Sequence, residues 1–522
     1  MLTSSITPDA LSKILESFLA DAPNAVALEN GEVLFDFATA RYSISGEGKC
    51  VLHMWSDERN AVRRVLDAEL KPRLLRLSVL RFGQSQPTVL EICADRDQRS
   101  PTALRAIRAR YRQIFERVLL REFPGYKLDS VSNRADLEHS CSPVYTRGVL
   151  RQGQSAFAVL GVSAEETQPS IDAALTFGIL WMHRQREQLA GRAHVQGLRL
   201  FLPAGRSEMV RQRMAHLNRD AAKWQLYELD ERAETCAPLD CEDSGNIVTR
   251  LVRAVDASAA RTRFATSIAR IRAMAPAAEA CVESSTEIIF RLHGLEFARA
   301  KLAPVEGSFR NNEVITFGLW PAEYTLDDSN EPTFRDLVTR LAQRRNSRGD
   351  HGDPLFRLCP ERWLESLITC DVGAIDERLD HRFVYSQVPA FASTDRAMID
   401  VLTCTLDGRL AIVELKADED IHLPLQGLDY WARVRWHQQH GGFLRNGYFA
   451  GRELSPILSE DPPLLYLVAP ALRTHPATDT LLRYLSPQIQ WTVVQVDERW
   501  RDAVRVVNRK HPQNLSTTDL HR

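Results

Sequence analysis

The 522-residue sequence lacks long apolar segments and paired cysteines. No apolar run approaches the ~18 residues that a membrane-spanning helix needs, so we expect no membrane contact. The nine cysteines are scattered and include no C-x-x-C pair, which argues against a zinc site and is typical of the reducing cytoplasm. Because Met1 to Ala22 also lack a signal-peptide pattern, we expect a cytoplasmic protein.

Several common catalytic motifs are missing as well. The sequence contains no P-loop, no H-E-x-x-H and no G-x-S-x-G. An energy-coupled motor and the commonest hydrolase sites are therefore not expected within this chain. The net charge of −2 identifies no partner, but lysine is scarce: only eight of the 66 basic residues are lysines. Compositional bias explains most of this scarcity, yet each retained lysine becomes informative.

The C-terminal third has the clearest pattern of helices and strands. Apolar periodicity and the Asp407-Gly408 hairpin signal predict the order α-β-β-β-α-β-α-β. The expected elements are a helix over 360–368, strands over 383–391, 397–406 and 410–415, a helix over 423–440, a strand over 464–469, a helix over 478–485 and a strand over 489–496. This order predicts a mixed sheet covered by helices.

Residues 100–230 repeat this order and suggest an internal duplication. We expect a helix over 104–120, strands over 144–150 and 155–162, a helix over 168–184, a strand over 195–202, a helix over 209–217 and a strand over 224–229. Aligning Val159–Glu166 with Ile412–Glu419 also places Phe177 near Tyr430. Chance similarity between two α/β domains is the alternative explanation.

Three polar residues gather at the ends of two predicted strands in the C-terminal third. Asp400 lies on the second strand, and Glu414 and Lys416 end the third strand across the hairpin. Alternate residues of a strand share a face, so Glu414 and Lys416 point the same way and the hairpin brings Asp400 close. Clustered carboxylates repel each other unless a cation lies between them, and hard divalent cations prefer such oxygen ligands.

This D-x13-E-x-K spacing resembles the PD-(D/E)XK nuclease superfamily. Gln426-x-x-x-Tyr430 opens the next helix as in the RecB-like branch, and Glu365 matches the helix acid that these folds often bring to the metal. The resemblance covers roughly residues 355–500. It departs from the family pattern at Ile399, where a proline often precedes the aspartate, and Glu361 is an alternative to Glu365.

The resemblance implies a restriction-endonuclease-like αβββαβ core and hydrolysis of DNA with Mg²⁺ or Mn²⁺. The implied metal ligands are Asp400, Glu414 and Glu365, and Lys416 would assist the attacking water. Gln426 and Tyr430 would hold the nucleic acid. The upstream copy would be degenerate, because Gly161 and Ser163 replace Glu414 and Lys416, while Thr146 and Arg147 lie near the Asp400 position.

The E-x-K triplet alone is a weak signal. Two others occur, Glu47-Gly48-Lys49 in a glycine turn and Glu69-Leu70-Lys71 at the end of a helix-like run. Neither ends an apolar strand that follows a hairpin and an aspartate and precedes Q-x-x-x-Y. A surface strand with an ordinary Glu–Lys pair is the structural alternative at Lys416.

A basic stretch lies upstream. Residues 59–121 hold 15 Lys and Arg against six Asp and Glu, and Arg105, Arg108 and Arg112 share one helix face. They are candidates for binding phosphates, or else a solvated face in an arginine-rich protein.

The sequence thus predicts a mixed α/β protein in four parts. The expected partner is a nucleic acid, DNA, and a helicase or other protein is a further candidate partner. The parts are a strand-rich accessory domain over 1–98, a degenerate nuclease-like domain over 99–235, a helical linker and strand-rich segment over 236–350, and a nuclease-like domain over 351–522. The linker candidate is 346–354, and a softer boundary lies near 233–245. The alternatives are a non-catalytic nucleic-acid-binding or scaffold protein and a nuclease acting on RNA.

Overall fold

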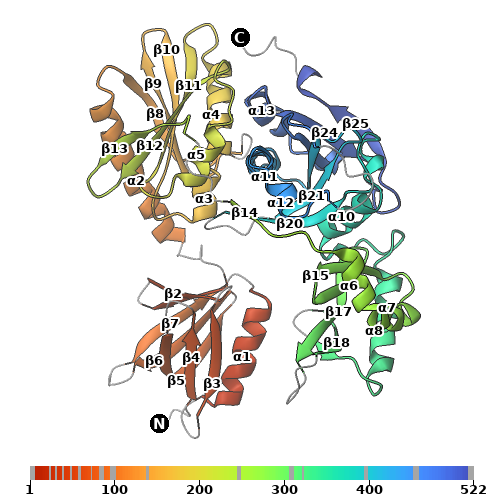
Figure 1. Cartoon of the computed structure of the whole chain (residues 1–522). Coiled ribbons are helices and arrows are strands. Elements are labelled where there is room, and N and C mark those ends of the chain that lie inside the picture. The colour runs from red at the N-terminus through yellow and green to blue at the C-terminus, as the bar shows by residue number, and fades with distance from the viewer. Residues whose placement is uncertain are drawn as a thin grey trace. The chain divides into compact units, whose positions relative to one another are not determined.

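Figure 1 shows the computed structural model, a mixed α/β protein, which confirms the predicted fold class. It describes residues 6–22, 25–29, 32–37, 40–46, 50–56, 60–71, 73–81, 87–94, 101–136, 140–243, 249–304, 311–319, 323–392, 398–450 and 458–514. None of the helices in these ranges combines the length and apolar character that a membrane crossing requires. The chain forms two compact units, Met1–Ala109 and Arg110–Arg522.

The first unit is an antiparallel sheet covered by one helix. Its strand order is β2-β1-β7-β6-β5-β4-β3, and helix α1 (Pro8–Ala20) packs on it through Leu11 and Leu15. The strands are β1 (Val26–Glu29), β2 (Glu32–Asp36), β3 (Arg41–Ser45), β4 (Cys50–Trp55), β5 (Asn60–Lys71), β6 (Leu74–Arg81) and β7 (Thr88–Cys93). Most of the described residues of this unit lie in strands.

The two competing E-x-K triplets fall in this unit. Glu69-Leu70-Lys71 ends strand β5 and not a helix, so the helix-like interpretation was wrong. Pairing with β6, where Glu69 lies opposite Arg76, decides the local structure. Glu47-Gly48-Lys49 lies outside the described residues.

The second unit begins with a sheet of order β13-β12-β11-β10-β9-β8. Its strands are β8 (Lys127–Ser132), β9 (Tyr145–Gln152), β10 (Ser155–Val162), β11 (His194–Pro203), β12 (Lys223–Asp230) and β13 (Thr235–Leu239). Helix α2 (Pro101–Glu122) packs on one face, and α3 (Gln168–Asp172), α4 (Ala174–Gln188) and α5 (Glu208–Met214) belong to the other. We call β8–β13 with α2–α5 the first lobe.

A second sheet in this unit has the order β14-β20-β21-β22-β23-β24-β25. Its strands are β14 (Thr249–Leu251), β20 (Tyr385–Ala392), β21 (Met398–Cys404), β22 (Leu410–Leu415), β23 (Leu464–Pro470), β24 (Gln490–Val496) and β25 (Val506–Lys510). Helix α10 (Pro360–Cys370) packs on one face, and α11 (Leu423–Gln439) and α13 (Thr478–Arg483) pack on the other, with α12 (Gly442–Arg445) after α11. We call β20–β25 with α10–α13 the second lobe.

The two lobes have the same strand directions as well as the same strand order. In the first lobe β8, β9 and β10 pair antiparallel, β10 to β12 pair parallel and β13 returns antiparallel; β20 to β25 do the same in the second. This agreement is the order expected of an internal duplication. The edge strands β8 and β13 were not predicted, and the expected boundary at 235/236 falls inside β13.

The lobes pack against each other with approximate two-fold symmetry. Leu217 after α5 forms an isolated antiparallel bridge with Leu485 after α13. The flanking bonds are reciprocal: the Asn218 amide donates to the Tyr484 carbonyl at 2.8 Å, and the Ser486 amide donates to the His216 carbonyl at 2.9 Å. Helix α4 likewise contacts α13, while α11 contacts α5. Each of these contacts between the lobes is therefore matched by a second contact between the equivalent elements, as in an isologous dimer.

Within 236–350, the elements from Ala257 to Arg344 form an accessory domain between the lobes in sequence. Its sheet has the order β15-β16-β17-β18-β19, and Phe334 of α8 is buried in its core. Its elements are α6 (Ala257–Arg263), α7 (Ala265–Met274), β15 (Glu279–Ser284), β16 (Glu287–Leu292), β17 (Leu295–Pro304), β18 (Asn311–Phe317), β19 (Tyr324–Thr325) and α8 (Glu331–Arg344). Only α9 (Pro354–Arg357) separates α8 from α10. Strand β14 of this region joins the second lobe's sheet through β20.

We expect His437 on α11 to cause a loss of stability in mild acid. Its Nε2 lies 3.0 Å from Thr249 Oγ1 of β14, and burial, with smaller effects of His440 and Arg445, lowers the pKa of His437 to about 4. Below pH 6.5 the His437 side chain becomes protonated in the unfolded chain, whereas in the folded chain it stays neutral down to about pH 4. The free energy of unfolding that is present above pH 6.5 therefore decreases as the pH falls from 6.5 to 4.

Substituting His437→Gln should remove up to about 3 kcal/mol of this pH-dependent loss. Urea unfolding between pH 7 and pH 4 measures it, with the exposed His381→Gln as control. An unchanged acid limb in His437→Gln would contradict the assignment.

Candidate active site

The β21–β22 hairpin brings Asp400 and Glu414 together. Gly408 in its turn has a φ of 87°, which glycine adopts without strain. The pairing of Val401 with Val413 puts the preceding Asp400 opposite Glu414. Asp400 Oδ2 accepts the Leu415 amide at 3.0 Å. The sequence spacing and the observed register therefore place these two carboxylates at the same end of the sheet.

Lys416 lies between carboxylates from two elements. Its Nζ donates to Glu414 Oε1 at 3.3 Å and lies 3.9 Å from Glu361 Oε1 of α10. Burial lowers the pKa of Lys416, but the charges of Glu414, Glu361 and Asp400 outweigh it and hold the pKa above its ordinary value. The lysine is therefore a fully charged, nearly buried ammonium group.

Helix α10 supplies acids to both sides of this cluster. Glu365, 4% exposed, has its Oε2 within 3.0 Å of Arg362 and accepts the Gln387 side-chain amide at 2.9 Å. Glu361, one turn earlier, reaches Lys416. The sequence left the choice between these two acids open; Glu365 shares the Gln387 amide with Asp400, and Glu361 lies beside Lys416.

Gln387 joins the site without having been predicted from the sequence. Its Nε2 donates to Glu365 Oε2 and, at 3.2 Å, to Asp400 Oδ1. It has a φ of 50° and lies opposite Asp400, between the pairs Ser386–Val401 and Val388–Ile399 of β20 and β21. A positive φ strains a non-glycine residue, and such strained residues often occur at functional sites. No sequence signal marks this conformation, because Gln387 lies inside an ordinary strand pattern.

The site holds buried negative charge that is only partly compensated. Glu414 is 1% exposed, and burial together with Asp400 raises its pKa well above the ordinary value; burial also raises the pKa of Glu365. Among the described residues, Glu414 Oε2 and Glu365 Oε1 are buried without a hydrogen-bond partner. These oxygens are the donors that a hard divalent cation prefers, so the residues present fit Mg²⁺ or Mn²⁺.

The carboxylates are not in complete metal-binding geometry. In the described part of the chain, no three His, Cys, Asp or Glu side chains form a group that could hold a metal ion. Other oxygens of the cluster are engaged by Arg362, Gln387 and the Leu415 amide. Coordination by Asp400, Glu414 and Glu365 together would require these bonds to rearrange.

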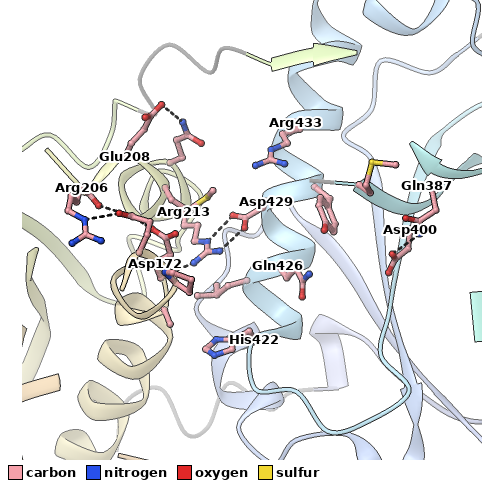
Figure 2. Close-up of a pocket in the computed structure, with 18 of the residues that line it drawn as sticks. Asp172, Arg206, Glu208, Arg213, Gln387, Asp400, His422, Gln426, Asp429 and Arg433 are labelled. Carbon is pink, nitrogen blue, oxygen red and sulfur yellow. Dashed lines mark hydrogen bonds and ion pairs between the residues drawn. The ribbon is translucent and has the colours of Figure 1, made fainter. Parts of the chain in front are cut away.

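Gln426 and Tyr430 line a cleft beside the site. Figure 2 shows this cleft, with Gln426 labelled. The cleft has a volume of about 890 Å³, and Asp400 and Gln387 also line it. Burial and the nearby Glu414 raise the pKa of Tyr430, which Gln426 contacts by a side-chain hydrogen bond. The Q-x-x-x-Y pair and the acidic cluster therefore belong to one continuous surface.

The three predicted phosphate-binding arginines share one helix. Arg105, Arg108 and Arg112 are on α2, whose Tyr111 and Phe115 pack on the first lobe's sheet and not on the sheet that carries Asp400. Arg105 is exposed, and Arg108 and Arg112 are half-buried. Arg112, which belongs to the second unit as the Asp400 cluster does, lies outside that cluster.

The first lobe has aromatic rings where the second has acids. A Cβ added to Gly161, the counterpart of Glu414, would lie 2.5 Å from Tyr111 Oη and 2.8 Å from Phe115. These residues are four apart on α2, as Glu361 and Glu365 are on α10. Ser163, the counterpart of Lys416, donates to Glu231 at 3.0 Å, and Thr146 lies opposite Gly161. This pocket is filled and has no place for a cation.

Comparison with known proteins does not add a family. No protein-family model matches the chain, and no curated protein matches its sequence. The geometry of the second lobe and its motif resemblance are therefore what indicates a function for the chain.

Proposed function

We propose that the chain is a metal-dependent nuclease of the PD-(D/E)XK type that hydrolyses phosphodiester bonds in DNA. The observation that carries this proposal is the meeting of Asp400, Glu414, Glu365 and Lys416 at one end of the second lobe's sheet, with two buried carboxylate oxygens unpartnered among the described residues. Burying such charge is costly and is typical of functional sites.

Each side chain has a distinct part in this reaction. Asp400, Glu414 and Glu365 would hold Mg²⁺, which when bound supplies polarisation of a phosphoryl oxygen and a water of lowered pKa. Lys416 keeps its charge and would stabilise the negative charge developing on the phosphoryl oxygens. Gln387 orients Glu365 and Asp400, while Gln426 and Tyr430 would contact the strand.

The proposal predicts strict dependence on a divalent cation and on Lys416. Substituting Lys416→Met keeps the aliphatic stem but removes the charge, and should reduce cleavage about 10²-fold or more. Cleavage is measured on linear and circular single- and double-stranded DNA with Mg²⁺, Mn²⁺ or EDTA. The exposed Lys301→Met serves as control. Cleavage in EDTA, or wild-type cleavage by Lys416→Met, would refute the proposed site.

A second candidate is a non-catalytic nucleic-acid-binding protein that retains the nuclease fold. The filled pocket of the first lobe favours it, as does the incomplete metal geometry in the described residues of the second. Binding of DNA without cleavage under every metal condition would establish this candidate instead.

A further inference from the structure

The cleft beside Asp400 is formed by both lobes. Its near wall comes from α11, β20 and β21, with Gln426, Gln387 and Asp400. Its far wall comes from the first lobe, where α3 and α5 contribute Gln168 and Gln212. In Figure 2, Asp172 and Arg213 mark this wall. The lobe that lacks the acidic cluster therefore still borders the site.

A buried ion pair joins the two walls. Arg213 of α5 donates to both carboxylate oxygens of Asp429 of α11, at 2.8 and 2.6 Å, and also to the Asp172 carbonyl at 2.6 Å. Both side chains of the pair are 12% exposed. A bidentate, largely buried pair of this kind fixes the distance between α5 and α11. The cleft thus has a set width and is not a loose gap between domains.

The lining is balanced in charge and rich in amides. Four arginines are matched by four acids, and the four glutamines add donor and acceptor groups; the charged residues are Arg206, Arg213, Arg362, Arg433, Asp172, Glu208, Asp400 and Asp429. Duplex DNA presents mainly phosphates to a protein and is attracted by a surplus of positive charge. Side-chain amides instead pair with the edges of bases, which a single strand exposes.

We propose that this cleft binds single-stranded DNA, and that the first lobe is retained because it supplies the far wall. This inference rests on the proposed nuclease function and specifies its substrate. A volume of about 890 Å³ lies within the ~300–1,000 Å³ of sites that enclose small ligands, enough for a few unpaired nucleotides and far too little for a duplex. The bases contact the glutamines of both walls as the backbone passes Asp400.

Gln212 offers the cleanest test, because it lies on the far wall, away from the acidic cluster. In the described structure its side chain makes one hydrogen bond, a long one of 3.4 Å from Nε2 to Glu208 Oε1, so Gln212→Met should leave the fold intact while removing the amide. Gln343→Met on the exposed side of α8 is the matched control. Binding is measured in EDTA, without cleavage, by fluorescence anisotropy of labelled oligo-dT, oligo-rU and a duplex of equal length.

The expected result is tighter binding of oligo-dT than of the duplex or oligo-rU, and about fivefold weaker oligo-dT binding by Gln212→Met alone, as for the loss of one net hydrogen bond. Equal binding of the duplex, preference for oligo-rU, or wild-type affinity in Gln212→Met would overturn the inference. If any of these occurs while the wild-type protein cleaves DNA with Mg²⁺, the nuclease proposal survives and only the cleft assignment fails. Selective oligo-dT binding without cleavage would support the cleft assignment and contradict the nuclease proposal.

Discussion

Substituting Glu414→Gln should abolish cleavage and at the same time raise the thermal stability of the metal-free protein. The amide cannot replace an anionic metal ligand, so we expect a loss of at least about 10³-fold in rate. Stability should rise because folding without a cation must bury Glu414 beside Asp400, and both effects disfavour the charged carboxylate, as its raised pKa shows. The Lys416 ammonium can still donate to the amide oxygen.

Two measurements together test this prediction. Nuclease assays with Mg²⁺ report the rate, and thermal unfolding in EDTA and in Mg²⁺ reports stability. The wild-type protein should gain stability on adding Mg²⁺, whereas Glu414→Gln should gain little. The exposed Glu377→Gln is the control and should behave as wild type in both assays. Retained cleavage, or an equal stabilisation by Mg²⁺, would show that Glu414 is not a ligand.

Substituting Arg345→Met should destabilise the second unit by about 3–5 kcal/mol. Arg345 has no exposed surface, and burial lowers its pKa to about 10. Its guanidinium lies 4.7 Å from the Trp363 ring. It donates to the main-chain carbonyls of Leu292, His293, Leu355, Leu358 and Cys359. Methionine leaves these buried acceptors unsatisfied and removes the bond between the accessory domain and the start of α10.

Urea unfolding provides the measurement, and a matched control is available on α8. Arg340 is 64% exposed and pairs with Asp336 one turn away, so Arg340→Met should change stability by no more than about 0.5 kcal/mol. Because α10 carries Glu361 and Glu365, the folded fraction of Arg345→Met should also cleave more slowly. Stability within 1 kcal/mol of wild type would show that the buried arginine contributes little.

The lobe interiors could be predicted from the sequence because their strands are continuous apolar runs. Strands β10 and β22 lie in the middle of their sheets and are buried on both faces. In the sequence, burial on both faces is visible as an unbroken run of mostly apolar residues. The edge strands β8 and β13 are half-exposed. Each forms a strand because it pairs with a neighbouring strand, and its own residues do not favour a strand over a loop. A polar edge strand resembles a loop in sequence.

The site was predictable where it is local and unpredictable where it is assembled from distant segments. The hairpin alone places Asp400, Glu414 and Lys416 together, so their spacing in sequence carries the information. The bond from Gln387 to Asp400 depends on how β20 registers against β21, and Arg213 meets Asp429 although 216 positions separate them. Pairings of that kind leave no periodicity in the sequence.

The reciprocal bridge at Leu217 and Leu485 has a further consequence for how the sequences of the two lobes can diverge. In a homodimer every substitution occurs in both subunits, so a change that fills one pocket fills both. Here the halves share one chain, and Tyr111 and Phe115 close one pocket while the acids of the other stay in place. Their contact also does not weaken on dilution, since the linked halves never leave each other's vicinity. Covalent linkage thus lets one half specialise without sacrificing the other.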